Sequence, residues 1–214
     1  YFENQTSCYG TPFKVERVYT HLQEPYINCL ILNTKVLIPT TGSMWDDDAI
    51  QAYENAMPGY EVLGFSGSWY NTDALHCRTK GIPDRFMLYI EHTPLFGFQN
   101  GDDGIEIQAK IVPHSEENLI INSTCVYWRE NKRNWDSVQM TSIEENYYQA
   151  IIYPKENGAI VDYYIHAEDN SNRSENHPYI GAPGAHSFIV NISQINNPPD
   201  KPEKPSGLTN GKTG

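Results

Sequence analysis

Long apolar runs are missing from this 214-residue sequence. No stretch approaches the roughly 18 apolar residues that a membrane-spanning helix needs. Basic residues are also scarce, because 15 lysines and arginines stand against 27 aspartates and glutamates, for a formal net charge of -12. They are scattered along the chain, so the basic stripe of a nucleic-acid-binding protein is missing. We therefore expect a soluble piece without a membrane span and without a nucleic-acid partner.

Cysteines are few and lack the spacing of a metal or redox site. The four of them, Cys8, Cys29, Cys77 and Cys125, form no C-x-x-C pair and are too sparse for a disulfide framework. Their pairing stays open. The acidic runs at 46–48 and 102–103 lack the alternating oxygen ligands of a calcium loop. A helix start and a turn account for them, so no metal site is predicted.

The first part of the chain has the pattern of a β-β-α-β unit. A short strand is expected over residues 13–20. Residues 28–33 and 35–39 are apolar stretches separated by Asn33-Thr34, which predicts a hairpin. Residues 60–65 predict a further strand.

A helix is predicted between the hairpin and that further strand. Ser43 and Asp46 have capping-box spacing, and the negative charges at 46–48 favour a helix amino terminus. An apolar face continues to Met57, and Pro58-Gly59 ends the helix. Because such a unit cannot bury its apolar face alone, we expect neighbouring units upstream.

The second part of the chain predicts a β-sandwich. Residues 86–91 predict a buried strand of the first domain, and the turn formers at 97–104 mark the boundary, so that the domains are 1–104 and 105–193. Apolar and polar residues alternate over 161–167, which predicts one strand face that packs on the core and one that contacts solvent. Short strands are expected at 105–111, 119–121, 125–129, 147–153, 160–167 and 186–192. Residues 194–214 are rich in proline and predict a semi-rigid linker to a further module.

Cys77 is the candidate nucleophile. Its loop, residues 66–79, is rich in short polar side chains that can orient a guanidinium, and Trp69 and Tyr70 are placed to wall off water. The reactive form of cysteine is the thiolate, which a nearby cation favours. A buried inert thiol or a disulfide partner is the alternative reading of a single cysteine.

The segment 72–79, TDALHCRT, resembles the nucleophile segment of bacterial peptidyl-arginine deiminases, relatives of the agmatine deiminases. The resemblance continues at 24–33, 56–61 and 161–170. It implies that the first domain is the carboxy-terminal part of an α/β-propeller of β-β-α-β units, followed by an immunoglobulin-like antiparallel sandwich. It also implies that Cys77 is the nucleophile, that Asn28 is the active-site asparagine of a Pro-Tyr-x-Asn segment, and that Thr72 lies near the substrate pocket.

The implied activity is hydrolysis of peptidyl-arginine to peptidyl-citrulline with release of ammonia, which needs no cofactor. The implied partners are arginine-containing proteins or peptides, and the implied location is secreted or on the cell surface. The family's acid-base histidine and substrate-binding aspartates belong to an earlier part of the propeller, so we expect an upstream half and an inactive fragment. We expect His76 to be structural, because in an extended segment its side chain points away from that of Cys77.

Two alternative functions stay open at this point. The propeller and the nucleophile are also those of deiminases that act on agmatine or free arginine, although the attached sandwich argues against a small-molecule enzyme. A cell-surface binding or spacer module without catalysis is the other alternative, in which the sandwich and the proline-rich linker dominate. Finding the histidine and aspartates upstream in the full-length gene would distinguish an enzyme from a binding module.

Overall fold

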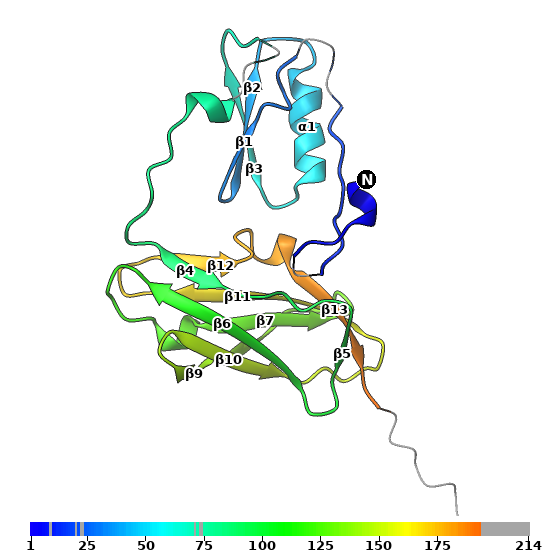
Figure 1. Ribbon diagram of the computed structural model, residues 1–214, viewed down its shortest axis with the longest axis vertical. Coiled ribbons are helices and arrows are strands. Elements are labelled where there is room, and N and C mark those ends of the chain that lie inside the picture. The colour runs from blue at the N-terminus through cyan, green and yellow to red at the C-terminus, as the bar shows by residue number, and fades with distance from the viewer. Residues whose placement is uncertain (9, 20, 22–23, 71, 73–74, 194–214) are drawn as a thin grey trace, which may run out of the picture.

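The computed structural model describes residues 1–8, 10–19, 21, 24–70, 72 and 75–193, which form two units joined by a connecting segment at 79–87 (Figure 1). The first unit holds a three-stranded sheet and a helix, and the second holds a four-stranded and a six-stranded sheet. The chain is thus mostly β-sheet with few helices. Within the described ranges, no helix is long and apolar enough to span a bilayer.

The first unit has the predicted β-β-α-β order: β1 (Leu30–Leu32), β2 (Lys35–Thr40), α1 (Asp46–Ala56) and β3 (Glu61–Ser66). A short 3-10 helix, η1 (Phe2–Asn4), precedes it. Strands β1 and β2 form an antiparallel hairpin, and Asn33 makes the tight turn with a φ of 52°. Strands β2 and β3 are parallel, with α1 as their crossover.

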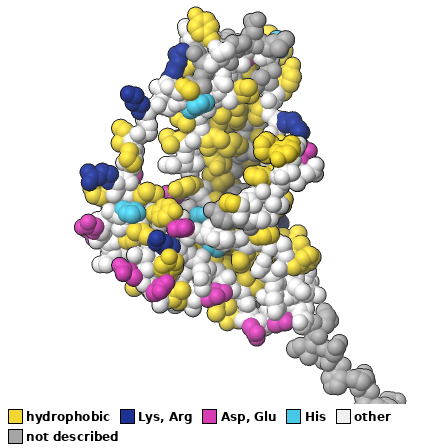
Figure 2. All heavy atoms as spheres, in the orientation of Figure 1, with side chains coloured by type: hydrophobic (Ala, Val, Ile, Leu, Met, Phe, Trp, Pro, Cys, Tyr) yellow, Lys and Arg dark blue, Asp and Glu magenta, His cyan; other side chains and the backbone are white. Residues whose placement is uncertain are grey.

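Helix α1 covers only one face of this sheet. Val36 and Ile38 of β2 are fully buried there, against Ala49 and Tyr53 of the helix. Side chains alternate along a strand, so Leu37 and its neighbours in register, Leu30 and Leu63, lie on the opposite face. On that face Leu32 is 51% exposed and Phe65 is 45% exposed. Figure 2 shows hydrophobic side chains gathered over this sheet.

Two local predictions for the first unit are wrong. The capping box does not form, because Trp45 is the helix N-cap and no side chain caps it. The Asp46 carboxylate instead accepts hydrogen bonds from the N–H of Gly42 at 2.8 Å and from the hydroxyl of Tyr26 at 2.8 Å, which ties the helix start to the preceding loop. Residues 13–19 form no strand, because they find no sheet partner and Val18 packs on the core beneath α1.

The second unit is a sandwich of two sheets. The first sheet has the order β4 (Leu88–Glu91), β6 (Ile105–Pro113), β10 (Tyr147–Ile152) and β9 (Thr141–Glu144). The second has the order β5 (Phe98–Asn100), β13 (His186–Asn191), β11 (Ile160–Glu168), β7 (Cys125–Glu130) and β8 (Asp136–Gln139), with β12 (Ser174–His177) paired to β11. All pairs are antiparallel except β5 with β13.

One core joins the two sheets. Ile107 and Ile111 of β6 and Ile152 of β10 are fully buried, and they share a cluster with β11. Along β11 the buried residues of this cluster are Val161, Tyr163, Ile165 and Ala167. This confirms the predicted core face of that strand.

The sandwich begins earlier in the chain than predicted. Strand β4 pairs with β6, and its Leu88 and Ile90 lie in the sandwich core, so residues 88–91 do not belong to the first unit. Strand β5, within the predicted boundary, pairs with β13. The strand predicted at 119–121 is also wrong: Leu119 makes an isolated bridge to Asp169, and η3 (Ile121–Ser123) is a 3-10 helix.

The units touch each other at two glycines. A methyl group added at Gly59, which follows α1 and has a φ of +92°, would lie 2.4 Å from Cβ of Pro183 in η4 (Ala182–Gly184). At Gly10 the same addition would meet the ring of Phe96 at 2.6 Å. The turn after α1 therefore packs closely on the sandwich. The predicted linker at 194–214 lies outside the described residues.

Candidate functional site

Cys77 lies on a short 3-10 helix, η2 (Leu75–Arg78), that closes the first unit. Leu75 is buried, whereas Cys77 is exposed. The segment is helical, so the prediction of an extended segment is wrong. The buried Leu75 side chain anchors η2, which also lies against β2, and leaves the thiol on the outer side.

Asn28 lies in the turn before β1, where its N–H donates to the carbonyl of Pro25 at 2.9 Å. Tyr26 fixes this turn: it is almost fully buried, it donates to Asp46, and its carbonyl accepts a hydrogen bond from the Tyr53 hydroxyl at 3.0 Å. The turn is therefore held against α1. Asn28 itself is half-buried.

The backbone joins the two predicted segments of the site. The N–H of Leu75 donates to the carbonyl oxygen of Asn28 at 2.9 Å. Nδ1 of His76 donates to the carbonyl oxygen of Cys29 at 3.3 Å. The structure thus brings Asn28 and the Cys77 helix together, and His76 has a structural contact.

Two aromatic residues of the loop behave differently from one another. The Trp69 indole donates to the Phe65 carbonyl at 2.8 Å, and the Arg78 guanidinium lies 4.9 Å from the centre of its ring. Tyr70 is 75% exposed, and its role in excluding water stays a prediction. Trp69 supports the end of η2 through Arg78.

Thr72 is exposed in the loop before η2, and its neighbours 71, 73 and 74 lie outside the described residues. Across the described part of the chain, no hydrogen bond links Thr72 to Asn28 or Cys77. Its assignment to the substrate pocket stays a prediction.

The other three cysteines have different surroundings. Cys125 is buried at the start of β7, and burial raises the pKa of its thiol, which keeps it in the unreactive form. Cys8 is exposed near the amino terminus, and Cys29 is half-buried beside Asn28. All four are free thiols. Of these cysteines, Cys77 alone combines exposure with a place on η2.

The described residues supply an accessible thiol and little to activate it. None of the hydrogen bonds or ion pairs found among them joins Cys77 to a histidine or a carboxylate. They also contain no group of three or more His, Cys, Asp or Glu residues placed to hold a metal ion. A nucleophilic cysteine needs a base or a cation beside it, and the hydrogen bonds and ion pairs found among the described residues give Cys77 neither.

Two residues near this site were not predicted from the sequence. The first is Leu75, the buried anchor of η2, whose only signal was one leucine in a largely polar loop. The second is Asp84, which follows η2 in the connecting segment and forms an ion pair with Arg173 of the sandwich. No sequence pattern indicates a contact between positions so far apart.

Comparison with known protein families finds a match in the first unit. Residues 7–83 match the family of Porphyromonas-type peptidyl-arginine deiminases. The match includes Asn28, Thr72 and Cys77 and ends in the connecting segment, before the sandwich begins. It supports the peptidyl-arginine deiminase family for the first unit and a deiminase-type function in general.

Among solved structures, the chain is similar to an engineered protein known from a crystal structure, with a TM-score of 0.37 and 6% sequence identity. The similarity covers 69% of this chain and 36% of that protein. The chain therefore spans well under half of the length of that protein.

Proposed function

We propose that this chain is the carboxy-terminal part of a protein-arginine deiminase in which Cys77 is the nucleophile. The Cys77 thiolate attacks the guanidinium carbon of a peptidyl arginine and forms a C–S bond. A histidine of the upstream half protonates the departing nitrogen, and the C–N bond breaks to release ammonia. Water then attacks the thiouronium carbon, the C–S bond breaks, and citrulline leaves with the thiolate restored.

The observation that carries this proposal is the contact between η2 and the turn of Asn28. Two separate segments were predicted to belong to one active site, and Leu75 bonds directly to Asn28. The family match over residues 7–83 supports the chemistry. The acidic balance of the chain, with its net charge of -12, favours substrates that carry arginine.

The open apolar face of the first unit supports an upstream half of the catalytic domain. Leu32 and Phe65 are exposed on the sheet face that α1 leaves uncovered. A β-β-α-β unit of a propeller would bury this face against a neighbouring unit. That neighbour would also bring the histidine and the guanidinium-binding carboxylates to Cys77, so we expect this chain to be inactive alone.

The strand order of the second unit supports an immunoglobulin-like domain. The orders β4-β6-β10-β9 and β13-β11-β7-β8 follow the ABED and GFCC′ sheets of that fold. Trp128 lies on β7, the counterpart of strand C, and packs on the core as the tryptophan of that strand does. A domain of this kind with a proline-rich linker is typical of exported proteins, which is our reason for proposing a secreted or cell-surface location.

The test is citrulline formation from an arginine-containing peptide by the polypeptide with its upstream half. Cys77→Ser should lose most turnover, because a serine hydroxyl is scarcely ionised near neutral pH. Cys8→Ser and Cys125→Ser serve as matched controls and should retain activity. Loss of activity in either control, together with an active Cys77→Ser variant, would show that another cysteine is the nucleophile.

A further inference from the structure

The chain that leaves the Cys77 helix has little structure of its own before it reaches the sandwich. After Arg78, the Thr79 hydroxyl donates to the His76 carbonyl at 3.1 Å, and residues 80–83 are exposed and form neither helix nor strand. The seven residue steps from Cys77 to Asp84 span at most about 25 Å when fully extended. Whatever fixes Asp84 therefore limits where η2 can move.

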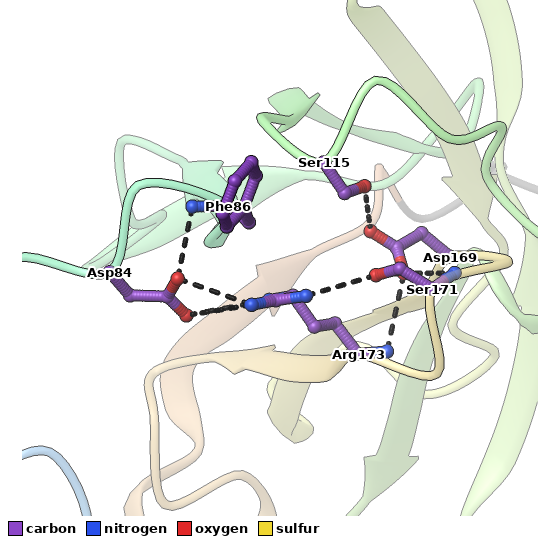
Figure 3. A network of polar contacts seen from close by, with 6 residues as sticks. All are labelled: Asp84, Phe86, Ser115, Asp169, Ser171 and Arg173. Atoms are coloured by element: carbon purple, nitrogen blue, oxygen red, sulfur yellow. Dashed lines mark hydrogen bonds and ion pairs between the residues drawn. The ribbon is translucent and has the colours of Figure 1, made fainter.

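Asp84 is fixed by an arginine of the sandwich. Figure 3 shows the Arg173 guanidinium beside the Asp84 carboxylate. Nη2 of Arg173 lies 3.2 Å from Oδ1 of Asp84, and Nε lies 3.4 Å from Oδ2. Oδ1 of Asp84 also accepts the N–H of Phe86 at 2.9 Å, and the guanidinium lies 5.9 Å from the centre of the Phe86 ring. The Phe86 N–H and then Arg173 lower the pKa of Asp84 below its ordinary value, so it is charged near neutral pH.

Arg173 is itself held by a partly buried network. Its Nη1 donates to the Ser171 hydroxyl at 3.2 Å, and its backbone N–H donates to the Asp169 carboxylate at 3.2 Å. Asp169 is fully buried and accepts further hydrogen bonds from the Ser115 hydroxyl at 2.7 Å and the Ser171 N–H at 2.9 Å (Figure 3). Burial alone would raise the pKa of Asp169, but these hydrogen bonds lower it, so the network keeps its charge.

We propose that Arg173 is a positioning residue for Cys77: by clamping Asp84 to the sandwich, it holds the connecting segment and so keeps η2 seated on the turn of Asn28. For catalysis this inference rests on the proposed deiminase function. The clamp itself is a property of the 214-residue chain, so it can be tested without any activity. It gives the sandwich a part in the proposed reaction.

The test is hydrogen exchange of the 214-residue chain, followed by mass spectrometry over residues 75–83. Arg173→Ala should speed exchange there about two- to fivefold, the range that an exposed ion pair supports, and leave β6 and β11 unchanged. Asp84→Asn, which keeps the shape of the side chain and removes its charge, should have the same effect. Arg133→Ala is the matched control, because Arg133 forms an ion pair with Glu156 elsewhere on the sandwich.

Unchanged exchange over 75–83 in the Arg173→Ala variant would overturn the proposal. Faster exchange that spreads over β6 and β11 would overturn it as well, because Arg173 would then only stabilise the sandwich. In the polypeptide with its upstream half, Arg173→Ala should lower kcat and leave KM nearly unchanged. If that polypeptide forms no citrulline while the exchange result holds, the deiminase proposal fails and the clamp stands.

Discussion

The carbonyl oxygen of Asn28 accepts a 2.9 Å hydrogen bond from the N–H of Leu75, the first residue of the helix that carries Cys77. This bond joins the turn before β1 to the end of the first unit. It places the proposed nucleophile and the proposed active-site asparagine in one local structure. The sheet, α1 and the buried Tyr26 hold one side of that structure, and Leu75 holds the other.

The sandwich should need residues upstream of 105 to reach its full stability. Leu88 and Ile90 of β4 are only 3% and 7% exposed, and β4 pairs with β6. A piece covering 84–193 should therefore unfold cooperatively in urea at a higher midpoint than a piece covering 105–193. Equal midpoints for the two pieces would show that β4 contributes nothing to the sandwich.

A point substitution tests the same strand within the whole chain. Leu88→Ala should lower the free energy of unfolding by about 2 to 5 kcal/mol, the usual loss for a buried leucine. Ile82→Ala is the matched control, since Ile82 is 92% exposed and its substitution should change stability by less than about 0.5 kcal/mol. Urea denaturation followed by circular dichroism measures both.

Three histidines of the sandwich meet in its interior. His92 lies 2.8 Å from the Tyr163 hydroxyl through Nε2 and 2.6 Å from the Gln108 carbonyl through Nδ1. Nδ1 of His177 lies 3.1 Å from Nε2 of His186. Burial lowers the pKa of His92 to about 4 and that of His186 to about 3, and repulsion from the neighbouring histidines acts in the same direction.

The stability of the sandwich should therefore fall as the pH falls below about 6.5. Below that value the unfolded chain binds protons on these histidines that the folded chain does not, which favours unfolding until the folded pKa is reached. The loss between pH 7 and pH 5 should be roughly 1 to 2 kcal/mol for each of His92 and His186. Urea denaturation midpoints measured between pH 5 and pH 7 give the dependence of stability on pH.

A substitution identifies the groups responsible for that slope. His186→Gln should flatten the pH dependence of stability between pH 7 and pH 5, even where it lowers stability at pH 7. His114→Gln is the control, because His114 is exposed on the same domain and its substitution should leave the pH dependence of stability unchanged. If His186→Gln kept the full slope, His186 would not be a source of the acid sensitivity.

The close approach at Gly59 should be sensitive to any side chain. Gly59→Val adds strain at a positive φ and a clash with Pro183, so it should lower the melting temperature and loosen the contact between the turn after α1 and η4. Gly158→Val separates the two effects: Gly158 has a φ of +79°, and nothing lies within 4 Å of an added methyl group. The Gly59 variant should lose clearly more stability than the Gly158 variant. Equal losses would mean that backbone strain alone matters.

The elements predicted correctly are those with a regular spacing of apolar side chains. Strand β2 of the hairpin around Asn33, helix α1 and strand β11 each bury apolar residues at a regular spacing, and these elements formed as predicted apart from the cap of α1. Strand β9 (Thr141–Glu144) is wholly exposed and is held by backbone bonds to β10, so its sequence shows no alternation. Strand β12 has the polar sequence Ser-Glu-Asn-His and was missed for the same reason.

Residue types and motifs predicted which residues belong to the site but not how they are connected. Cys77 and Asn28 were identified by the segments around them, and the structure brings those segments together. Their connection runs through backbone groups of Leu75 and Asn28, which no side-chain pattern encodes. The position of β4 was missed because Leu88 and Ile90 indicate a buried strand without indicating which sheet buries it.

The most direct test of the account is to trap the covalent intermediate. The polypeptide with its upstream half is mixed with an arginine-containing peptide, quenched in acid within the first turnover, digested and examined by mass spectrometry. We predict an adduct of the peptide, less ammonia, on Cys77, and none in the Cys77→Ser variant. An adduct on Cys8, Cys29 or Cys125, or citrulline formed at the full rate by Cys77→Ser, would contradict it.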